Sequence, residues 1–139
     1  MELFVVIGLI GVLTAISTPF LLSYVRTSAL RAGAEELVTV LNRARHLAIS
    51  NNRSVCVTNV GTRVQYRVGC GPTVWAGTGT DGSGFIQLAN NITVTGPQVM
   101  FTYIGTAPTI NGTYTVTNPQ NGTTLGVVVA ASGRVSITP

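Results

Sequence analysis

The sequence predicts an α+β protein in which one long N-terminal α-helix packs on a small antiparallel β-sheet head. Two observations carry this prediction. Leu3 to Val25 contains no charged residue, and an apolar pattern of helical period follows it to about Ser50. Beyond Asn52, apolar residues recur at every second position in short runs separated by Gly, Pro and Asn. Because 139 residues support one ordinary globular domain, we expect these runs to form one head.

Residues 1–25 are expected to form a transmembrane helix. About 23 uncharged residues, each rising about 1.5 Å, reach about 34 Å and cross a bilayer core. A buried core helix is the alternative, but a domain this small could hardly cover so long a helix on every side. A cleaved signal peptide is disfavoured because the run opens with Glu2, lacks a basic start, and continues into an amphipathic pattern without a break.

Residues 26–52 are expected to form the amphipathic second half of the same helix. Arg31 and Glu35 stand four residues apart on its polar side, as an ion pair along a helix requires. The apolar residues recur at alternating spacings of four and three, which places them on one stripe: Leu30, Ala34, Leu37, Leu41, Ala44 and Ala48. This stripe should lie on the head.

The helix has a predicted weak point between Gly11 and Pro19. The proline ring removes a backbone donor and clashes with the preceding turn. Gly11, Thr14 and Ser17 weaken the same stretch. We therefore expect the helix to be kinked or melted there.

Residues 53–139 are expected to form the β-rich head. The clearest hairpin pairs a strand with Val55 and Val57 to one with Val64, Tyr66 and Val68, across a turn near Gly61. Residues 69–84 are rich in Gly and Thr and predict a surface loop. Asn121-Gly122 is a strong turn signal. Further strands are expected at Phe85–Leu88, Ile92–Thr95, Val99–Ile104, Tyr114–Thr117, Leu125–Ala131 and Val135–Thr138.

Charge and cysteine content add two expectations. The formal net charge is +4 and all eight basic residues are arginines, which permits anionic partners without requiring them. Cys56 and Cys70 lie in an apparently exported region, where an even count favours a disulfide over two reduced thiols. Such a bridge, closing about 15 residues, would stabilise the fold by roughly 3 kcal/mol.

The N-terminal segment resembles the first helix of type IV pilins and type II secretion pseudopilins. The resemblance rests on the run Glu2-Leu3-Phe4-Val5-Val6-Ile7-Gly8-Leu9-Ile10-Gly11-Val12-Leu13, followed by Pro19. The segment from Glu36 to Arg45, with Ala48 and Val55, resembles the H-type pseudopilin and FimT-like branch. Members of that branch end their β-head near a Gly-Arg pair, which Gly133-Arg134 matches here.

This resemblance implies a precursor held in the bacterial inner membrane, cut and N-methylated by a prepilin peptidase, and polymerised by pilus assembly machinery. The product is a helical homo-oligomeric filament, either an extracellular pilus or a periplasmic pseudopilus. The implied filament core comprises Leu3, Phe4, Val5, Val6, Ile7, Leu9, Ile10, Val12 and Leu13. In assembled family filaments the helix often loses regular structure, here from Gly11 to about Pro19.

Glu2 is implied to set the register of assembly by pairing with the terminal amine of a neighbouring subunit. Physical chemistry agrees, because a carboxylate at the edge of an apolar helix is costly to bury without a partner. A position at the membrane surface is the alternative role. In the family four residues precede this glutamate, whereas only Met1 does here, so we expect three residues of the mature start to be missing.

Enzyme chemistry finds little support. One His, two Cys and four acidic residues show no spacing typical of a metal or nucleophile site, so we expect no catalytic residue, metal or cofactor. We interpret His46 as a surface residue, and Asp81 as a turn residue rather than a calcium ligand. Trp75 is either a contact for a neighbour or packed on the head. Four asparagines precede Ser or Thr by two and are weak candidates for glycosylation: Asn52, Asn91, Asn111 and Asn121.

Three functions compete. The leading hypothesis is a structural pilin that repeats along a type IV pilus or pilus-like fibre. The alternative is a minor pilin or pseudopilin that primes assembly, serves type II secretion, or binds DNA during uptake. In that last role Arg134 would contact phosphate, but Ser136 replaces the second arginine of FimT-like relatives, so nucleic acid lacks positive support as a partner. The third is a membrane-tethered adhesin.

Overall fold

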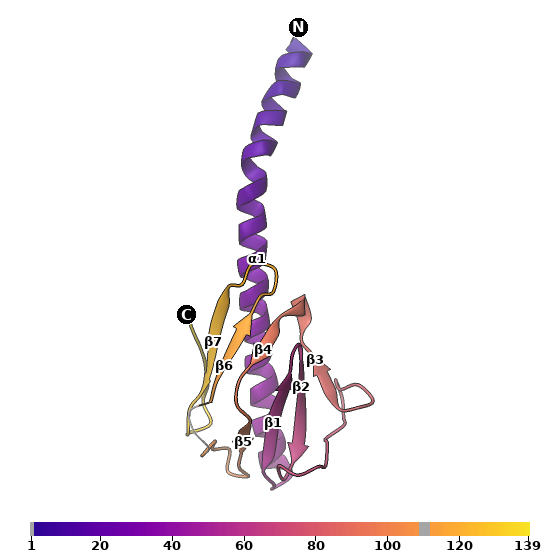
Figure 1. Ribbon diagram of the computed structural model, residues 1–139, viewed down its shortest axis with the longest axis vertical. Helices are drawn as coiled ribbons and strands as arrows, with labels where there is room; N and C mark the ends of the chain where they lie inside the picture. The colour runs from indigo at the N-terminus through magenta and orange to yellow at the C-terminus, as the bar shows by residue number, and fades with distance from the viewer. Residues whose placement is uncertain (1, 109–111) are drawn as a thin grey trace.

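The computed structural model describes residues 2–108 and 112–139, and only the backbone of Thr18 and Pro19. A single helix, α1 (Glu2–Ser50), runs the length of the molecule, and all strands lie around its second half (Figure 1). The first half projects away from the head and ends at the N-terminus. The expected α+β architecture, with one long helix on an antiparallel head, is confirmed.

The head contains two antiparallel sheets of four strands each rather than one. The first has the order β3-β2-β1-β5 and the second β4-β6-β7-β8. The strands are β1 (Val55–Val60), β2 (Arg63–Val68), β3 (Phe85–Gln87), β4 (Thr93–Thr95), β5 (Val99–Phe101), β6 (Gly112–Thr117), β7 (Thr124–Val129) and β8 (Val135–Thr138), with a 3-10 turn η1 (Ala89–Asn91) before β4. Every expected strand is present: Val135–Thr138 has the expected bounds, and no end of the others is shifted by more than three residues.

The predicted hairpin across Gly61 is present. Val57 pairs with Tyr66 and Val55 with Val68, so the apolar residues of both strands share one face. Gly61 has a φ of +60°, which glycine adopts without the steric cost of a side chain. The main chain of the turn also reaches the second sheet, because the Val94 N–H donates to the Gly61 carbonyl at 2.9 Å.

The predicted stripe on the second half of α1 forms the centre of the core. All six of its residues are buried, and they pack against the inner faces of the strands. Gly33 allows α1 to approach Ile92 closely, because a Cβ at this position would overlap the Ile92 side chain. The Tyr66 hydroxyl donates 2.7 Å to the Val40 carbonyl and ties β2 to the middle of the helix.

The backbone of α1 stays helical through Gly11 to Pro19. The isolated subunit therefore shows no melted segment, and the expected loss of helix in an assembled filament stays a prediction. Thr14 and Ser17 fit the continuous helix because their hydroxyls donate to the carbonyls of Ile10 (2.9 Å) and Leu13 (2.8 Å).

The loop between β2 and β3 covers the outer face of the first sheet. Cys70 at its start is bonded to Cys56 of β1, with Cα atoms 5.0 Å apart, which confirms the expected disulfide. Gln65 of β2 points to the same outer side and donates 3.1 Å to the Ser83 carbonyl. Both Cys56 and Gln65 are buried as a result, although strand alternation alone predicts that they face solvent.

Candidate assembly surface

The first half of α1 is an apolar surface that the rest of the chain does not cover. Every described side chain from Glu2 to Ser28 is exposed, and Leu30 is the first buried one. The most apolar window of the helix has a mean hydropathy of 2.3, and none of it is buried. By length and composition this segment is able to cross a membrane. An exposed apolar surface this long is unstable in water and requires lipid or protein around it.

The hydroxyl groups in this segment do not interrupt its apolar character. Besides Thr14 and Ser17, Ser23 donates to the Phe20 carbonyl at 2.9 Å. These three hydroxyls are thus satisfied by their own helix, so their transfer into an apolar environment does not leave an unpaired donor.

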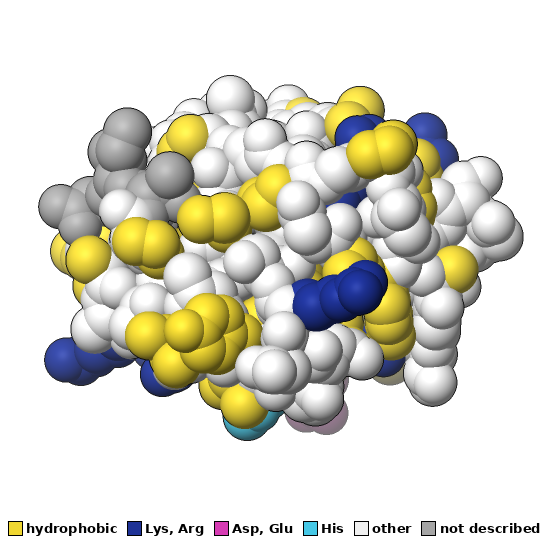
Figure 2. Space-filling view, turned by 90° about the horizontal axis from the view of Figure 1, so that it is seen from below, with side chains coloured by type: hydrophobic (Ala, Val, Ile, Leu, Met, Phe, Trp, Pro, Cys, Tyr) yellow, Lys and Arg dark blue, Asp and Glu magenta, His cyan; other side chains and the backbone are white. Residues whose placement is uncertain are grey.

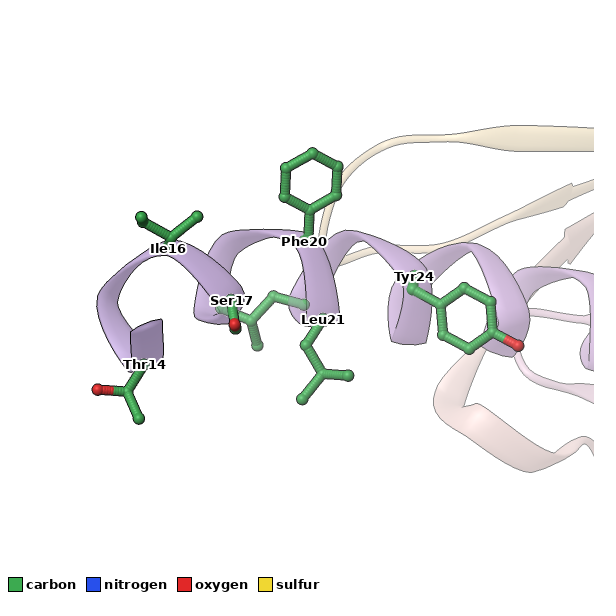
Figure 3. Close-up of a pocket in the computed structure, with 7 residues that line it drawn as sticks. Thr14, Ile16, Ser17, Phe20, Leu21 and Tyr24 are labelled. Atoms are coloured by element: carbon green, nitrogen blue, oxygen red, sulfur yellow. The ribbon is translucent and has the colours of Figure 1, made fainter. Parts of the chain in front are cut away.

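A shallow, open hollow lies along this segment at the turns before the head begins. Figure 3 shows Ile16 and Phe20 pointing to one side of the helix, and Thr14 and Leu21 to the other. One helix alone provides all of its lining: Thr14, Ile16, Ser17, Phe20, Leu21, Leu22 and Tyr24. Such spaces between side chains on a bare helix accept the side chains of a neighbouring helix rather than enclose a small ligand.

Polar contacts fix α1 on the head where the bare segment ends. The Asn118 side-chain amide donates to the Arg26 carbonyl at 3.3 Å, which brings the β6–β7 turn onto the helix. Glu36 accepts a hydrogen bond of 2.8 Å from the Ala89 N–H of η1. Arg31 and Glu35 form the predicted ion pair, at 3.3 Å, but both are exposed and contribute little to stability.

The expected assembly residues all lie on the bare segment. Glu2 is exposed near its free end, and so are all nine residues expected in a filament core. The pairing role of Glu2 stays a prediction. Arg134 is exposed at the opposite end of the molecule, after Gly133 in the β7–β8 turn.

The remaining candidates are on the head surface or the end of α1. Asn52, Asn91 and Asn121 are exposed, whereas Asn111 lies outside the described residues. His46 is exposed on α1. Asp81 accepts hydrogen bonds from the Ser83 (2.9 Å) and Phe85 (2.8 Å) N–H groups, as expected of a turn residue. Within residues 2–108 and 112–139, no three His, Cys, Asp or Glu side chains gather as metal ligands would.

Trp75 packs on the head, one of the two roles considered for it. Its ring lies 5.9 Å from that of Tyr66, and the Arg43 guanidinium lies 5.4 Å from its centre. Arg43 also donates to the Thr78 carbonyl, so this helix residue holds the loop from two sides. The sequence carried no signal for this contact, because Arg43 is distant from the loop along the chain.

A protein-family comparison decides where the chain belongs. The sequence profile of the type II transport protein GspH matches residues 33–133, which comprise most of the buried half of α1 and almost all of the head. The chain belongs to the GspH family. No curated protein sequence matches this GspH-family chain.

Solved structures share the fold of this chain. The type IV minor pilin FimU of Pseudomonas aeruginosa PAO1 is 19% identical in two crystal forms. For one crystal form the TM-score is 0.59, and the alignment covers 84% of this chain and 92% of the FimU chain. For the other form the TM-score is 0.56, and the alignment covers 78% of this chain and 92% of the FimU chain. The solution structure of Escherichia coli GspH is 16% identical, with a TM-score of 0.55, and covers 80% of this chain and 88% of its own. At these identities the likeness concerns the fold.

The expected resemblance to pilins and pseudopilins, on the H-type branch, is therefore confirmed, and the chain is a pilin-like subunit. The expectation of a repeating bulk pilin is not confirmed. The family and the similar structures agree better with the alternative, a minor pilin or pseudopilin.

Proposed function

We propose that this chain is a minor pilin or pseudopilin that enters a type IV pilus or a type II secretion pseudopilus through the bare half of α1. The observation that carries the proposal is the exposure of every described side chain from Glu2 to Ser28 on a helix whose other half is built into a GspH-family head. One continuous helix thus joins an apolar anchor to a folded head.

The bare segment suits two environments in turn. In the inner membrane, lipid surrounds its apolar side chains. In a filament, the same side chains pack against parallel helices of neighbouring subunits, where the surroundings are equally apolar. Transfer from membrane to filament therefore exposes little apolar surface to water at any stage.

Glu2 acts in this scheme as the residue that fixes axial register. Its carboxylate lies near the end of a segment without other charges up to Val25. Burial among helices is tolerated only when a cation, such as the terminal amine of a neighbour, lies within reach. A chain displaced along the fibre axis would bury the carboxylate unpaired.

The experiment compares one charge inserted on the bare segment with the same charge on the head. Ile10 is 55% exposed on α1 and Val60 is 60% exposed beside the β1–β2 turn, so Ile10→Asp and Val60→Asp disturb similarly exposed sites. We expect Ile10→Asp to be lost from purified fibres, because a carboxylate among apolar helices is costly. Val60→Asp should be incorporated normally. Normal incorporation of Ile10→Asp would contradict the proposal.

A further inference from the structure

The turns of α1 between the bare segment and the head carry a shallow polar groove. It is lined by Tyr24, Thr27, Ser28 and Arg31, which lie on one side of the helix and are all exposed. The Thr27 hydroxyl donates to the Ser23 carbonyl at 3.0 Å. Among the described residues, the hydroxyls of Tyr24 and Ser28 have no hydrogen-bond partner, so both are available to a ligand.

The head begins directly at this groove, without a spacer after the apolar segment. The uncharged run of the sequence ends at Val25. The Asn118 amide already bonds to the carbonyl of the next residue, Arg26, and Figure 1 shows the β6–β7 turn beside α1 at this level. On another side of the helix, Asn90 of η1 borders the same turns. A bilayer that surrounds the helix up to Val25 therefore reaches the edge of the head.

The groove has the length and the chemistry of a headgroup layer. Tyr24 and Arg31 are seven residues apart, about 10 Å along the axis, and the headgroup layer of one leaflet is about 5–8 Å thick. Tyr24 comes first, and a ring with a polar tip suits the boundary between acyl chains and headgroups. The Ser28 hydroxyl follows, and the Arg31 guanidinium lies outermost, where arginine binds phosphate through charge-assisted hydrogen bonds.

The cations of this region lie nearer the apolar segment than the carboxylates. Arg26 directly follows Val25, and Arg31 is six residues past it. Glu35 and Glu36 are ten and eleven residues past Val25, about 15 Å along the axis and beyond the headgroup layer. A bilayer surface around Tyr24 therefore meets the arginines first.

Arg31 keeps donors for a ligand although it has an ionic partner. Its bond to Glu35, at 3.3 Å, uses Nε alone, and both side chains are more than half exposed, so the pair is weak. Pro139 also lies beside Arg31, in a hollow with Leu125 and Ile137. Among the described residues, however, Arg31–Glu35 is the only ion pair, so the terminal guanidinium nitrogens of Arg31 remain available.

The two arginines also lie on the side of the bilayer where cations are disfavoured. The disulfide between Cys56 and Cys70 indicates that the head is on the oxidising, exported side. Cations that flank a membrane helix are usually retained on the cytoplasmic side. Arg26 and Arg31 therefore oppose insertion in this orientation, and a favourable contact on the exported side offsets that cost.

We propose that the groove of Tyr24, Ser28 and Arg31, together with Arg26 on the opposite side of α1, binds headgroups of anionic phospholipids in the exported leaflet. This inference rests on the membrane stage of the proposed function. An anionic headgroup attracts the arginines, whereas a zwitterionic headgroup adds a cation of its own to the same layer. The bound lipid would hold the edge of the head against the bilayer until the subunit leaves the membrane.

The direct test is photo-crosslinking of the full chain in nanodiscs that contain equal amounts of phosphatidylcholine and phosphatidylglycerol. A photoreactive residue replaces Thr27 in the groove or, as the control, Thr39 farther along α1. The two sites match, because each threonine is exposed and donates to a carbonyl of its own helix at 3.0 Å. Neither substitution removes a hydroxyl assigned to the lipid.

We expect the residue at position 27 to capture phosphatidylglycerol about fivefold more often than phosphatidylcholine, as one cation near an anionic surface provides. Lipid capture at position 39 should be much lower, because Thr39 lies about 20 Å past Val25. The inference is overturned by equal capture of the two lipids at position 27, by equal lipid yields at both positions, or by a dominant product with a second copy of this chain.

Charge removal provides a second readout. Arg26→Gln combined with Arg31→Gln should bring the ratio of the two lipids at position 27 close to one, and raised salt should lower the wild-type ratio. Figure 2 shows the opposite end of the molecule, where arginine side chains also lie on the surface. Arg53→Gln combined with Arg134→Gln removes the same charge from exposed sites on the head, far from the bilayer, and should leave the ratio unchanged. Equal effects of the two double variants would contradict the proposed site.

The two proposals fail in different ways. If Ile10→Asp removes the chain from fibres but the residue at position 27 captures both lipids equally, the proposed function stands and the lipid site is wrong. If Ile10→Asp is incorporated normally while the wild-type chain prefers phosphatidylglycerol, the lipid site stands and the bare helix is not the assembly element.

Discussion

The Tyr66 hydroxyl donates a hydrogen bond of 2.7 Å to the Val40 carbonyl, and so joins the first sheet to the middle of α1. Tyr66→Phe removes this buried bond and keeps the ring in place. We expect a loss of about 1 kcal/mol in the free energy of unfolding, measured on the full chain in detergent micelles. Tyr103→Phe, at an exposed tyrosine, should change it by less than about 0.5 kcal/mol. Equal effects would show that the buried bond contributes nothing.

Alkaline pH should destabilise the head. Burial raises the pKa of the Tyr66 and Tyr114 hydroxyls well above the usual value. Their neutral forms contribute full stability below the unfolded-state pKa of about 10, and this stability is lost as pH rises further, because the unfolded chain releases these protons first. Each tyrosine should contribute a slope of roughly 1.4 kcal/mol per pH unit.

The slope is obtained by measuring the free energy of unfolding at several pH values between about 9 and 11.5. Tyr66→Phe removes one of the two buried groups and should reduce the slope by about half. A flat profile in the wild-type chain would contradict the assignment of both hydroxyls as buried and neutral.

Loss of the disulfide should destabilise the head and release its longest loop. Replacing Cys56 and Cys70 together by Ser frees the loop that covers Gln65, and we expect a loss of roughly 3 kcal/mol, measured by urea unfolding. Reductant should lower the stability of the wild-type chain by a similar amount and leave the double variant unaffected. A wild-type chain insensitive to full reduction would disprove this contribution.

Gly133 should tolerate substitution less well than other turn glycines. Its φ is +81°, and a Cβ there would overlap the Gly105 carbonyl oxygen. We expect Gly133→Ala to cost more than about 2 kcal/mol in unfolding free energy, from backbone strain plus the clash. Gly122→Ala is the control, because Gly122 also has a positive φ, +69°, but open space around it, and should cost about 1 kcal/mol. Similar losses at both sites would argue against close packing of the β7–β8 turn on Gly105.

Periodicity alone predicted the parts of the fold that depend on neighbours in sequence. The stripe from Leu30 to Ala48 is a local helical pattern, and all of it is buried. The β1–β2 hairpin is equally local, because the turn at Gly61 determines its register. Sheet membership is different: β1 also pairs with β5, and no short-range pattern specifies that partner, so the division into two sheets was not predicted.

The covered outer face of the first sheet was also missed, although the sequence held a signal for it. Cys56 alternates with the core residues Val55 and Val57 and must point outward. A disulfide from that position to Cys70 requires the following loop to lie over the outer face, which explains the burial of Gln65. The contact of Arg43 with Trp75 had no comparable signal, because side-chain meetings across distant segments depend on the completed fold.

The abundance of this chain in purified fibres tests the central claim most directly. Pili or pseudopili sheared from producing cells are separated from membranes, and the molar ratio of this chain to the bulk subunit is determined by quantitative mass spectrometry. We predict that the chain is present in wild-type fibres at a small fraction of the bulk subunit and is absent when it carries Ile10→Asp. Finding it as the bulk component, or finding it only in membranes and never in fibres, would contradict its role as a minor subunit of the filament.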